Sequence, residues 1–443
     1  MLGDYRITGR RAADIAASVE QGVGSGELEP GQLLPPLREL AAGLGVNPNT
    51  VAAAYRTLRE RGVIETAGRR GSRVRARPAS SPREAIRVEA PEGVRDVSQG
   101  NPDIALLPQL GPPLARAAQR YAARPTLYGE PAVSPDLERW VRAEFDADGV
   151  PAGPVAVTSG SLDAIERVLA AHLRPGDAVA VEDPGWGSLL DLLPALGLRT
   201  VPVPLDDDGP LPEETGRALR QDVRALIVTA RAQNPTGAAV TEDRARALRA
   251  VLAAHPRTVL IEDDHGHGIV DLPLHTLTGS TEHWAVVRSA AKAYGPDLRL
   301  AVLTADPTTV GRVLGRLRLG PGWVSHLLQE TVLELARTGA ADPRTVARAY
   351  GERRAALIRA LAGHSLAGYG RSGMNVWVPV PDETLAVSRL LQAGWAVAPG
   401  ARFRTVSPPG VRLTVSPLSG PDAEDLAGAL AAAVRPRAAR RSG

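Results

Sequence analysis

Lys292 is the only lysine in this chain of 443 residues, which otherwise uses arginine for its strongly basic side chains. A lysine amine can lose its proton when it is desolvated and then attack a carbonyl carbon, whereas a guanidinium stays protonated in proteins. If this lysine survived by chance in an arginine-biased chain, no special chemistry should surround it. If it forms a Schiff base with an aldehyde cofactor, the chain must also supply a phosphate cradle, a partner for a ring nitrogen and a residue that stacks on the ring.

Several polar motifs follow apolar, strand-like runs in the body of the chain. TSGS (158–161) opens an amphipathic helix, where backbone amides and the Ser161 hydroxyl suit a phosphate group. Trp186 in DPGW and Asn234 in NPTG follow two further strands, at the edge where α/β folds place their ligands. The run EDDHGHG (262–268) ends a fourth strand, and its carboxylates are costly there unless they meet a cation such as a protonated ring nitrogen. These strand ends offer the three groups that a Schiff-base lysine needs.

The lysine itself lies in SAAKAYGPDLR (289–299), a turn between two apolar strands. Its spacing to Arg299 can place an amine at a ring aldehyde and a guanidinium on the phosphate. The order TSGS, DPGW, NPTG, EDD and S-x-x-K-x-x-x-P-x-x-R resembles that of fold-type I aminotransferases, over about residues 96–435. The resemblance implies an α/β body, with a mainly parallel sheet in a large domain and a smaller α+β C-terminal domain. It also implies pyridoxal 5'-phosphate as the cofactor, bound to Lys292 as an internal aldimine.

The same resemblance implies a role for each motif residue. Asp263 would pair with the pyridine nitrogen, Asn234 would hydrogen-bond the ring oxygen, and Trp186 would stack on the ring. The phosphate contacts would be Ser161, Ser289, Arg299 and, from the partner subunit of a homodimer, Tyr128. Near the C-terminus, Arg412 matches the arginine that binds a ligand carboxylate in this family, and it is the expected effector-binding residue.

Three positions depart from the family pattern. Ala291 precedes the lysine where serine is common, and Leu162 replaces a polar residue in the phosphate turn. His265 takes the place of a tyrosine that contacts the ring oxygen in many members, and we keep it among the cofactor-contacting residues. These changes weaken the expectation of efficient transamination more than that of cofactor binding. The histidine pair of EDDHGHG is also a conceivable metal site, but we expect no metal, because Asp263 beside it already has a cofactor role.

The first 77 residues have the pattern of a winged helix-turn-helix. In PLRELAAGLG (36–45) one apolar helix face is formed by Leu37, Leu40, Ala41 and Leu44, and Gly45 ends the helix. VNPNTVAAAYRTLRERG (46–62) starts a second helix with Asn47 as its N-cap and Pro48 at its first position. The expected buried stripe of this helix is Val51, Ala54, Tyr55 and Leu58, and Gly62 closes it. The segment 62–78 then predicts two short strands around a turn rich in glycine and arginine.

This head resembles the GntR family of bacterial regulators over about 70 residues. The second helix of such a module enters the DNA major groove by its N-terminus, while the wing lies on the phosphate backbone. The resemblance implies that the DNA contacts are Arg38, Asn47, Asn49 and Thr50, with Arg69, Arg70 and Arg73 on the wing. Head and body together resemble the MocR group of GntR regulators, in which an aminotransferase-like domain senses a ligand through pyridoxal phosphate.

Composition agrees with this division. The head, residues 1–77, carries 12 arginines against 8 acidic residues, so its charge of +4 exceeds the +3 of the whole chain. A basic head on a near-neutral body predicts double-stranded DNA as a partner of the head alone. The chain has no cysteine, which excludes disulfides, zinc-thiolate sites and thiol catalysis. No signal peptide or membrane-spanning run is present, so we expect a cytoplasmic protein with no membrane partner.

The sequence therefore predicts a winged helix-turn-helix domain (1–77), a linker (78–95), an aminotransferase-like domain (96–435) and a basic tail (436–443). We expect a homodimeric transcriptional regulator whose body binds pyridoxal phosphate and an amine or amino-acid effector. The alternative is a catalytically active aminotransferase that carries a DNA-binding head. The head favours the regulator, because an enzyme needs no winged helix, although residual transaminase activity would be compatible with it.

Overall fold

The computed structural model describes residues 5–25, 27–29, 31–60, 63–66, 71–75, 83, 86, 88–340 and 342–435. Its contacts divide the chain into two units. The first comprises Met1–Pro82 with the short stretches Leu173–Ala178 and Asp191–Thr200, and the second comprises the rest. Arg69 and Arg70 of the predicted wing, and the basic tail 436–443, lie outside the described residues.

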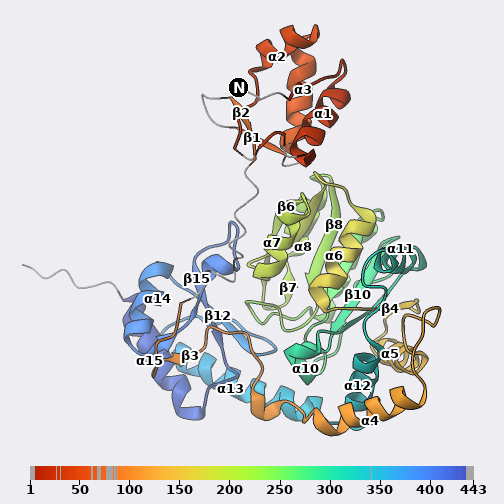
Figure 1. The fold of residues 1–443 in the computed structure, drawn as a ribbon. Coiled ribbons are helices and arrows are strands. Elements are labelled where there is room, and N and C mark those ends of the chain that lie inside the picture. Colours follow the sequence, from red (N-terminus) through yellow and green to blue (C-terminus); the bar gives the residue numbers. More distant parts are fainter. Residues whose placement is uncertain are drawn as a thin grey trace, which may run out of the picture. The chain divides into compact units, whose positions relative to one another are not determined.

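The head contains the expected helix-turn-helix and wing (Figure 1). Its elements are α1 (Ala12–Ser25), α2 (Leu37–Leu44), α3 (Pro48–Glu60) and the antiparallel strands β1 (Ile64–Thr66) and β2 (Ser72–Val74). Gly45 follows α2 with φ of 64°, a left-handed conformation that glycine adopts without steric cost. The predicted stripe of α3 is confirmed, since at most 1% of the surface is exposed at Val51, Ala54, Tyr55 and Leu58.

Two features of the head were not predicted. Leu37 begins α2 but is 38% exposed, so only Leu40 and Ala41 of the expected face are fully buried. Helix α1 supplies much of the remaining core through Ile15, which is completely buried, and Val19. No clear N-cap residue marks the start of α1 in the sequence. The apolar positions of α1 form a buried face only because α3 packs against them.

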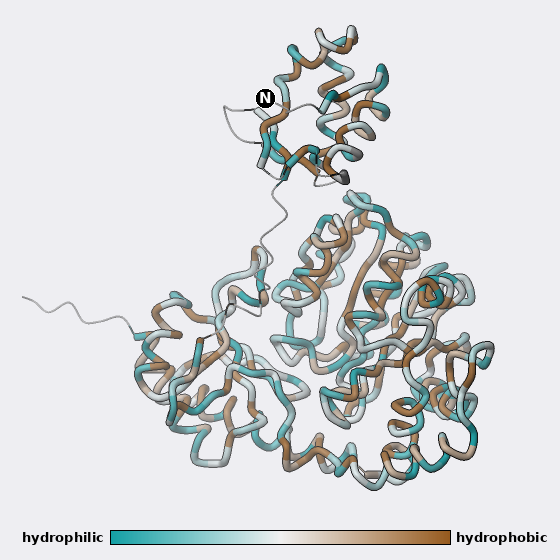
Figure 2. Tube along the Cα trace, in the orientation of Figure 1, coloured by the Kyte–Doolittle hydropathy of each residue, from teal (hydrophilic) through white to brown (hydrophobic). Residues whose placement is uncertain are grey.

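The body is organised around an eight-stranded sheet among the described residues, in the order β4-β11-β10-β9-β8-β5-β6-β7. The strands are β4 (Val155–Thr158), β5 (Ala178–Asp183), β6 (Arg199–Asp206), β7 (Gly209–Pro210), β8 (Val223–Thr229), β9 (Val259–Asp263), β10 (Trp284–Ser289) and β11 (Ala301–Ala305). Strands β8, β9 and β10 run parallel, whereas β11 is antiparallel to β10 and β4. The central strands are apolar along most of their length (Figure 2), as expected of strands buried on both faces.

Helices cover this sheet and connect its strands, and α6 lies against its face (Figure 1). The helices of this part are α4 (Gly111–Ala123), α5 (Pro135–Ala147), α6 (Ser161–His172), α7 (Gly187–Ala195), α8 (Pro212–Leu219), α9 (Glu242–Ala253), α10 (Ala291–Tyr294), α11 (Pro307–Arg318) and α12 (His326–Arg337), of which α4 and α12 pack against each other. Short 3-10 turns, η3 (Ile104–Leu106) and η4 (Pro296–Leu298), complete the set. Within the described residues, no helix is both long and apolar enough to span a membrane.

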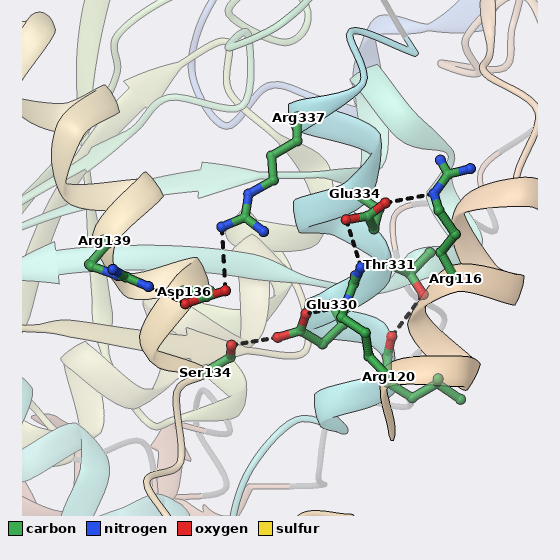
Figure 3. Close-up of polar contacts among 10 residues, drawn as sticks. Arg116, Arg120, Ser134, Asp136, Arg139, Glu330, Thr331, Glu334 and Arg337 are labelled. Carbon is green, nitrogen blue, oxygen red and sulfur yellow. Dashed lines mark hydrogen bonds and ion pairs between the residues drawn. The ribbon is translucent and has the colours of Figure 1, made fainter. Parts of the chain in front are cut away.

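A network of charged side chains ties α4 and α5 to α12 (Figure 3). Glu334 accepts hydrogen bonds from Arg116 at 2.7 Å and from Arg120 at 2.8 Å. The neighbouring Glu330 accepts from Arg120 at 3.2 Å and from the Ser134 hydroxyl at 2.5 Å. Glu334 binds two arginines of α4, and Glu330 joins α4 to Ser134 before α5, so the network ties both helices to α12.

The C-terminal part forms a smaller α+β layer. It contains α13 (Pro343–Gly363), β12 (Asn375–Pro379), α14 (Glu383–Gln392), β13 (Trp395–Ala396), β14 (Ala398–Pro399), η5 (Gly400–Arg402), β15 (Gly410–Thr414) and α15 (Gly420–Val434). Strand β3 (Arg95–Asp96), at the end of the predicted linker, pairs in parallel with β13. The Arg95 guanidinium lies 3.7 Å from the centre of the buried Trp395 ring, so the chain is anchored here directly after the linker.

Candidate cofactor-binding site

One cavity of about 360 Å³ lies where the carboxyl ends of the sheet strands meet the turn after β10. The structure brings to it nearly all the residues that the sequence assigned to the cofactor. These are Ser161, Trp186, Asn234, Asp263, His265, Ser289, Lys292 and Arg299. Leu162 and Ala291, two of the three departures from the family pattern, line the same cavity. Residues separated by up to 138 positions therefore meet because their strands are neighbours in one sheet.

The phosphate end of this cavity is a helix N-terminus beside an arginine. Ser161 is the first residue of α6, and its hydroxyl oxygen is buried with no hydrogen-bond partner among the described residues. Gly160 has φ of 107°, and a β-carbon there would lie 3.0 Å from Nη2 of Arg299. Arg299 also donates from Nη2 to the Ser159 carbonyl at 3.3 Å. These groups together fit a phosphate: the hydroxyl of Ser161 has no partner, the N-terminus of α6 offers backbone N–H groups, and the Arg299 guanidinium lies beside Gly160.

Lys292 lies in the short helix α10 and lines the same cavity. Its ammonium donates to the carbonyl oxygen of Gly100 at 2.6 Å. Ser289, at the end of β10, accepts a hydrogen bond from the backbone N–H of Ala291 at 3.1 Å. The serine thereby shapes the turn that presents the lysine.

The three consecutive carboxylates after β9 have three different environments. The side chain of Glu262 accepts from the Thr276 hydroxyl at 2.7 Å and from the backbone N–H of Leu277 at 3.0 Å, away from the cavity. Burial raises the pKa of Glu262 to about 7, against the lowering effect of these hydrogen bonds. The expectation that the carboxylates need one external cation is therefore too simple, because Glu262 is satisfied by neutral donors.

Asp264 is completely buried between two guanidinium groups. Arg231 donates to both of its oxygens, at 2.8 and 2.7 Å, and Arg288 donates to one of them at 2.9 Å. Burial by itself would raise the pKa of Asp264, but the two arginines lower it to about 2. Asp264 thus acts as the anionic centre of a structural network.

Asp263 alone of the three faces the cavity. One of its oxygens, Oδ2, lies 3.0 Å from Nδ1 of His265. The other, Oδ1, is buried and has no hydrogen-bond partner among the described residues. A buried carboxylate oxygen without a donor is costly, and a protonated ring nitrogen in the cavity would supply that donor. The pocket therefore fits pyridoxal phosphate at both its phosphate end and its ring nitrogen.

A possible metal cluster lies behind this site. Oxygens of Asp148 and Asp264 and a nitrogen of His267 lie within 4.8 Å of one another. Arg288 binds both of these carboxylates, so the positive charge that a metal would supply is already present. Burial and the nearby Arg288 lower the pKa of His267 to about 4. We therefore assign no metal to this cluster.

Arg412 in β15 reaches the cavity wall but does not line the cavity itself. It donates from Nη1 to Oδ1 of Asn234 at 3.0 Å and from Nη2 to the Ser98 carbonyl at 2.5 Å. Its guanidinium carbon also lies 4.7 Å from the centre of the Phe403 ring. Because the Asn234 oxygen is bound to Arg412, the group that Asn234 can offer to a ligand is its amide N–H.

Tyr128 lies apart from the cavity of its own chain. It is 95% exposed, and its ring meets that of Trp323 edge-on with the ring centres 5.6 Å apart. A role for Tyr128 at a cofactor therefore requires the cavity of a second subunit.

The predicted DNA-contacting residues of the head form two groups. Arg38, Asn47 and Asn49 are exposed and Thr50 is half-buried, at the start of α2 and α3. The Asn47 side chain accepts from the backbone N–H of Asn49 at 2.8 Å, as an N-cap does. Arg73 on the wing donates to Glu65 of the facing strand at 2.6 Å, and the rest of its half-exposed guanidinium can still contact a phosphate.

Sequence reasoning missed several buried residues that support the cavity. Glu182 precedes the DPGW motif and accepts from the Thr229 backbone N–H and hydroxyl and from Gln233. Burial raises its pKa to about 7 despite these donors. Gly100 and Arg231 were also missed. The one available signal was an arginine inside the apolar run ALIVTARAQNPTG, since a charge there needs a buried partner.

Comparison with known proteins agrees with this geometry. The family model for aminotransferase class I and II matches residues 95–430, and the model for bacterial regulatory proteins of the gntR family matches residues 11–74. The vitamin B6 salvage pathway transcriptional repressor PtsJ of Salmonella typhimurium is 40% identical, covering 95% of this chain and 98% of that protein. The pyridoxine biosynthesis transcriptional regulator PdxR of Corynebacterium glutamicum is 32% identical, covering 75% of this chain and 74% of that protein.

Solved structures resemble the body of the chain. A mutant of the Thermus thermophilus aspartate aminotransferase is 26% identical with a TM-score of 0.67, covering 80% of this chain and 99% of that one. The Pyrococcus horikoshii kynurenine aminotransferase is 20% identical with a TM-score of 0.70, covering 78% of this chain and 91% of that one. At this identity the likeness shows the fold alone. Both likenesses leave about a fifth of this chain unmatched.

Proposed function

We propose that this chain, which belongs to the aminotransferase class I and II family and carries a gntR-family head, regulates transcription in response to ligands of its cofactor pocket. Membership of these two families makes it a pyridoxal-phosphate-dependent, DNA-binding transcriptional regulator. The proposed divisions are the head (1–77), linker (78–95), sensing body (96–435) and tail (436–443). The observation that carries the proposal is a pocket with donors for phosphate and ring nitrogen in a chain that begins with a winged helix-turn-helix.

The side chains of the cavity have distinct proposed tasks. Pyridoxal phosphate supplies an aldehyde that combines reversibly with amines and a ring that withdraws electrons. Lys292 presents the only side-chain amine in the protein to that aldehyde. Ser161, Arg299 and the N-terminus of α6 hold the phosphate, and Ser289 orients the turn beside it. Because these groups come from different strands and turns, the phosphate fixes the ring relative to the lysine.

The ring end is held by a different set of residues. Oδ1 of Asp263 would accept a hydrogen bond from a protonated ring nitrogen, which would satisfy a buried oxygen. The amide of Asn234 would donate to the ring oxygen, and Trp186, which is half-buried on the cavity wall, would stack on the ring. An amine or amino-acid effector would reach Lys292 from the same cavity. Its carboxylate would pair with Arg412 if that guanidinium turned into the cavity from its contacts with Asn234 and Ser98.

We propose that the regulated genes belong to vitamin B6 metabolism and that pocket occupancy is the signal. The name of the 40% identical repressor and its near-complete coverage support this assignment. A regulator that binds pyridoxal phosphate specifically can report the supply of the vitamin, because ligand binding shifts the protein toward the arrangement that holds it better. The proposed location is the cytoplasm, which the gntR-family head and its DNA partner support.

A homodimer is the proposed assembly. Tyr128 is 95% exposed, and Leu127 and Ile104 are 68% and 85% exposed, so the body presents apolar side chains that a partner would cover. In such a dimer Tyr128 would complete the phosphate site of the other subunit. Light scattering of the cofactor-bound protein at micromolar concentration should give twice the chain mass of 46.5 kDa, and a monomer would contradict this assembly.

The function is tested by Lys292→Arg, which keeps the charge but removes the reactive amine. Wild-type protein should bind operator DNA with an affinity that changes on addition of pyridoxal phosphate. The variant should bind the same DNA, since its head is intact, without that response. Arg246→Ala, at an exposed position of α9, is the matched control and should behave as wild type. Sustained transamination at about 1 per second or faster would instead make the protein an enzyme.

A further inference from the structure

Arg83 lies in the predicted linker, and the second unit of the chain begins with this residue. Its guanidinium donates from Nη1 to two carbonyl oxygens, that of Ala401 at 3.0 Å and that of Arg404 at 2.9 Å. These carbonyls belong to the turn η5 and the residues directly after it. Carbonyl oxygens at the end of a helical turn lack a partner within the turn, and an arginine side chain can supply the missing donor. The contact therefore holds the start of the body against a turn that lies more than 300 positions later, at a separation of 318 positions for Ala401.

The same turn also contacts the DPGW motif (183–186). The backbone N–H of Gly185 donates to the carbonyl oxygen of Phe403 at 2.7 Å. A β-carbon at Gly187 would lie only 2.6 Å from the carbonyl oxygen of Arg402, so a glycine is needed for this close approach. Trp186 lies between these two glycines in the chain. The turn therefore fixes the backbone on both sides of the residue that is proposed to stack on the cofactor ring.

The first residue of the motif binds the chain that follows the turn. The buried carboxylate of Asp183 accepts hydrogen bonds from the backbone N–H groups of Thr405 at 2.7 Å, Val406 at 2.9 Å and Ser407 at 2.8 Å. Charge-assisted hydrogen bonds of this kind are stronger than those between neutral groups. Residues 401–407, which we call the 401–407 segment, are thus bound to the motif through both the turn and the residues after it.

The 401–407 segment also contacts the arginine that is proposed to bind the effector carboxylate. The ring of Phe403, which is buried, has its centre 4.7 Å from the guanidinium carbon of Arg412. If Arg412 turned into the cavity to meet a carboxylate, it would change this contact. One segment therefore contacts the linker residue Arg83, the motif that carries Trp186, and Arg412.

We propose that Arg83 is a positioning residue that holds the 401–407 segment and transmits the state of the cofactor pocket to the linker. The proposal rests on the proposed function and names the route by which occupancy of that pocket reaches the linker. A ligand that binds against Trp186 and Arg412 favours the arrangement of the 401–407 segment that supports both side chains, and this arrangement presents two carbonyls to Arg83. Because coupling between two sites is reciprocal, loss of the Arg83 contact should weaken cofactor binding.

The first test examines the contact without cofactor. In the cofactor-free full-length protein, Arg83→Ala should speed amide exchange at Gly185 and across the 401–407 segment by about threefold or more, the effect expected from the net contribution of one hydrogen bond. Arg359→Ala, at an exposed position of α13, is the matched control and should leave these rates unchanged. Unchanged exchange in Arg83→Ala would overturn the proposal, whatever the protein regulates.

The second test measures transmission. The affinity of wild-type protein for operator DNA with saturating pyridoxal phosphate should differ from that without it by at least about fivefold. Arg83→Ala should still bind the DNA and, more weakly, the cofactor, but the ratio of the two DNA affinities should fall to near one. An Arg83→Ala protein that keeps the wild-type ratio would refute the transmission. Wild-type protein whose DNA affinity ignores the cofactor would refute the proposed function and the transmission together, whereas the exchange rates would still decide whether Arg83 holds the segment.

A second variant tests whether the 401–407 segment is the route. Asp183→Asn keeps the size of the side chain but weakens the acceptor for residues 405–407. Asp183→Asn and Arg83→Ala should each weaken cofactor binding, and the double variant should lose less than the product of the two single losses, since both changes act on the same segment. Losses that multiply fully would show that the two residues act separately and would overturn the route.

Discussion

Lys292 in α10 donates to the carbonyl oxygen of Gly100, 2.6 Å away and 192 positions earlier in the chain. The same segment is held from its other side, since the Ser98 carbonyl accepts from Arg412 at 2.5 Å. The stretch after the linker thus contacts both Lys292 and Arg412. If Lys292 joined the cofactor, it would lose its hydrogen bond to the Gly100 carbonyl. Binding in the pocket would thereby affect the chain segment nearest the linker.

Loading with pyridoxal phosphate should therefore loosen residues 98–103. Their amide hydrogens should exchange faster in the loaded protein, because the contact from Lys292 is lost, while the sheet strands keep their protection. Hydrogen-exchange mass spectrometry with and without the cofactor measures this directly. Lys292→Ala should show the faster exchange without any cofactor. Slower exchange of this segment on loading would show that the cofactor closes it instead.

Gly160→Ala should impair the phosphate site. The position has φ of 107°, and the added carbon would lie 3.0 Å from Arg299, so we expect a loss of about 1–3 kcal/mol from strain and weaker cofactor binding. The control is Gly315→Ala in α11, where the new carbon meets open space and helix propensity should add up to about 1 kcal/mol of stability. Thermal unfolding and cofactor titration separate the two effects. Equal behaviour of both variants would contradict the proposed cradle.

Asp264→Asn should destabilise the body strongly. The change leaves Arg231 and Arg288, whose side chains are 6% and 4% exposed, without their shared anion, at a cost of about 3–5 kcal/mol. Asp208→Asn is the matched control, because Asp208 pairs with Arg371 where both side chains are 43% exposed, and such pairs contribute at most about 1 kcal/mol. Denaturant unfolding monitored by tryptophan fluorescence compares them. If Asp264→Asn lowers the free energy of unfolding by less than about 1 kcal/mol, the two arginines must rearrange to find other partners.

Glu262→Gln should become more stable relative to wild type as the pH rises. Burial raises the pKa of Glu262 from 4.5 to about 7, so the folded state keeps a proton between these values that the unfolded state has lost. Wild-type stability therefore falls through this window, by on the order of 3 kcal/mol, and the glutamine has no proton to lose. Unfolding midpoints at pH 5 and pH 8 measure the difference. Glu242→Gln, at a side chain that is 73% exposed, should show no such trend.

Changes in the head should separate sequence recognition from general DNA affinity. Asn49→Ala should alter the preferred DNA sequence, because its side chain is exposed at the start of α3. Arg69→Ala with Arg70→Ala should weaken binding to all sequences alike and reduce its dependence on salt. Fluorescence anisotropy at several salt concentrations distinguishes these outcomes. If the isolated body, residues 96–443, binds the same DNA equally well, the head is not the DNA-binding part.

Local patterns in the sequence were sufficient to predict the helix-turn-helix of the head and the strand ends that line the cavity of the body. The caps and apolar spacing around Asn47, Pro48 and Gly45 predicted α2 and α3, because helix ends depend on neighbouring residues. The motifs from TSGS to the single lysine predicted which strand ends would meet, since parallel strands direct their carboxyl ends to one edge of a sheet. Helix α1 was missed, and a short strand was expected in the linker without its place or its partner β13, because the burial of both elements depends on partners that are distant in the chain.

The tertiary structure alone decided how charge is distributed in the pocket. EDDHGHG reads as three equivalent carboxylates, yet Glu262 meets neutral donors, Asp264 meets two arginines and Asp263 meets His265. The sequence determined that a carboxylate, a lysine and a phosphate cradle would converge on one cavity. Which carboxylate keeps an unused oxygen, and which side chain meets its other oxygen, depends on distances of a few ångströms between separate segments of the chain. Electrostatic energies change steeply over such distances in a buried site, and no local pattern encodes them.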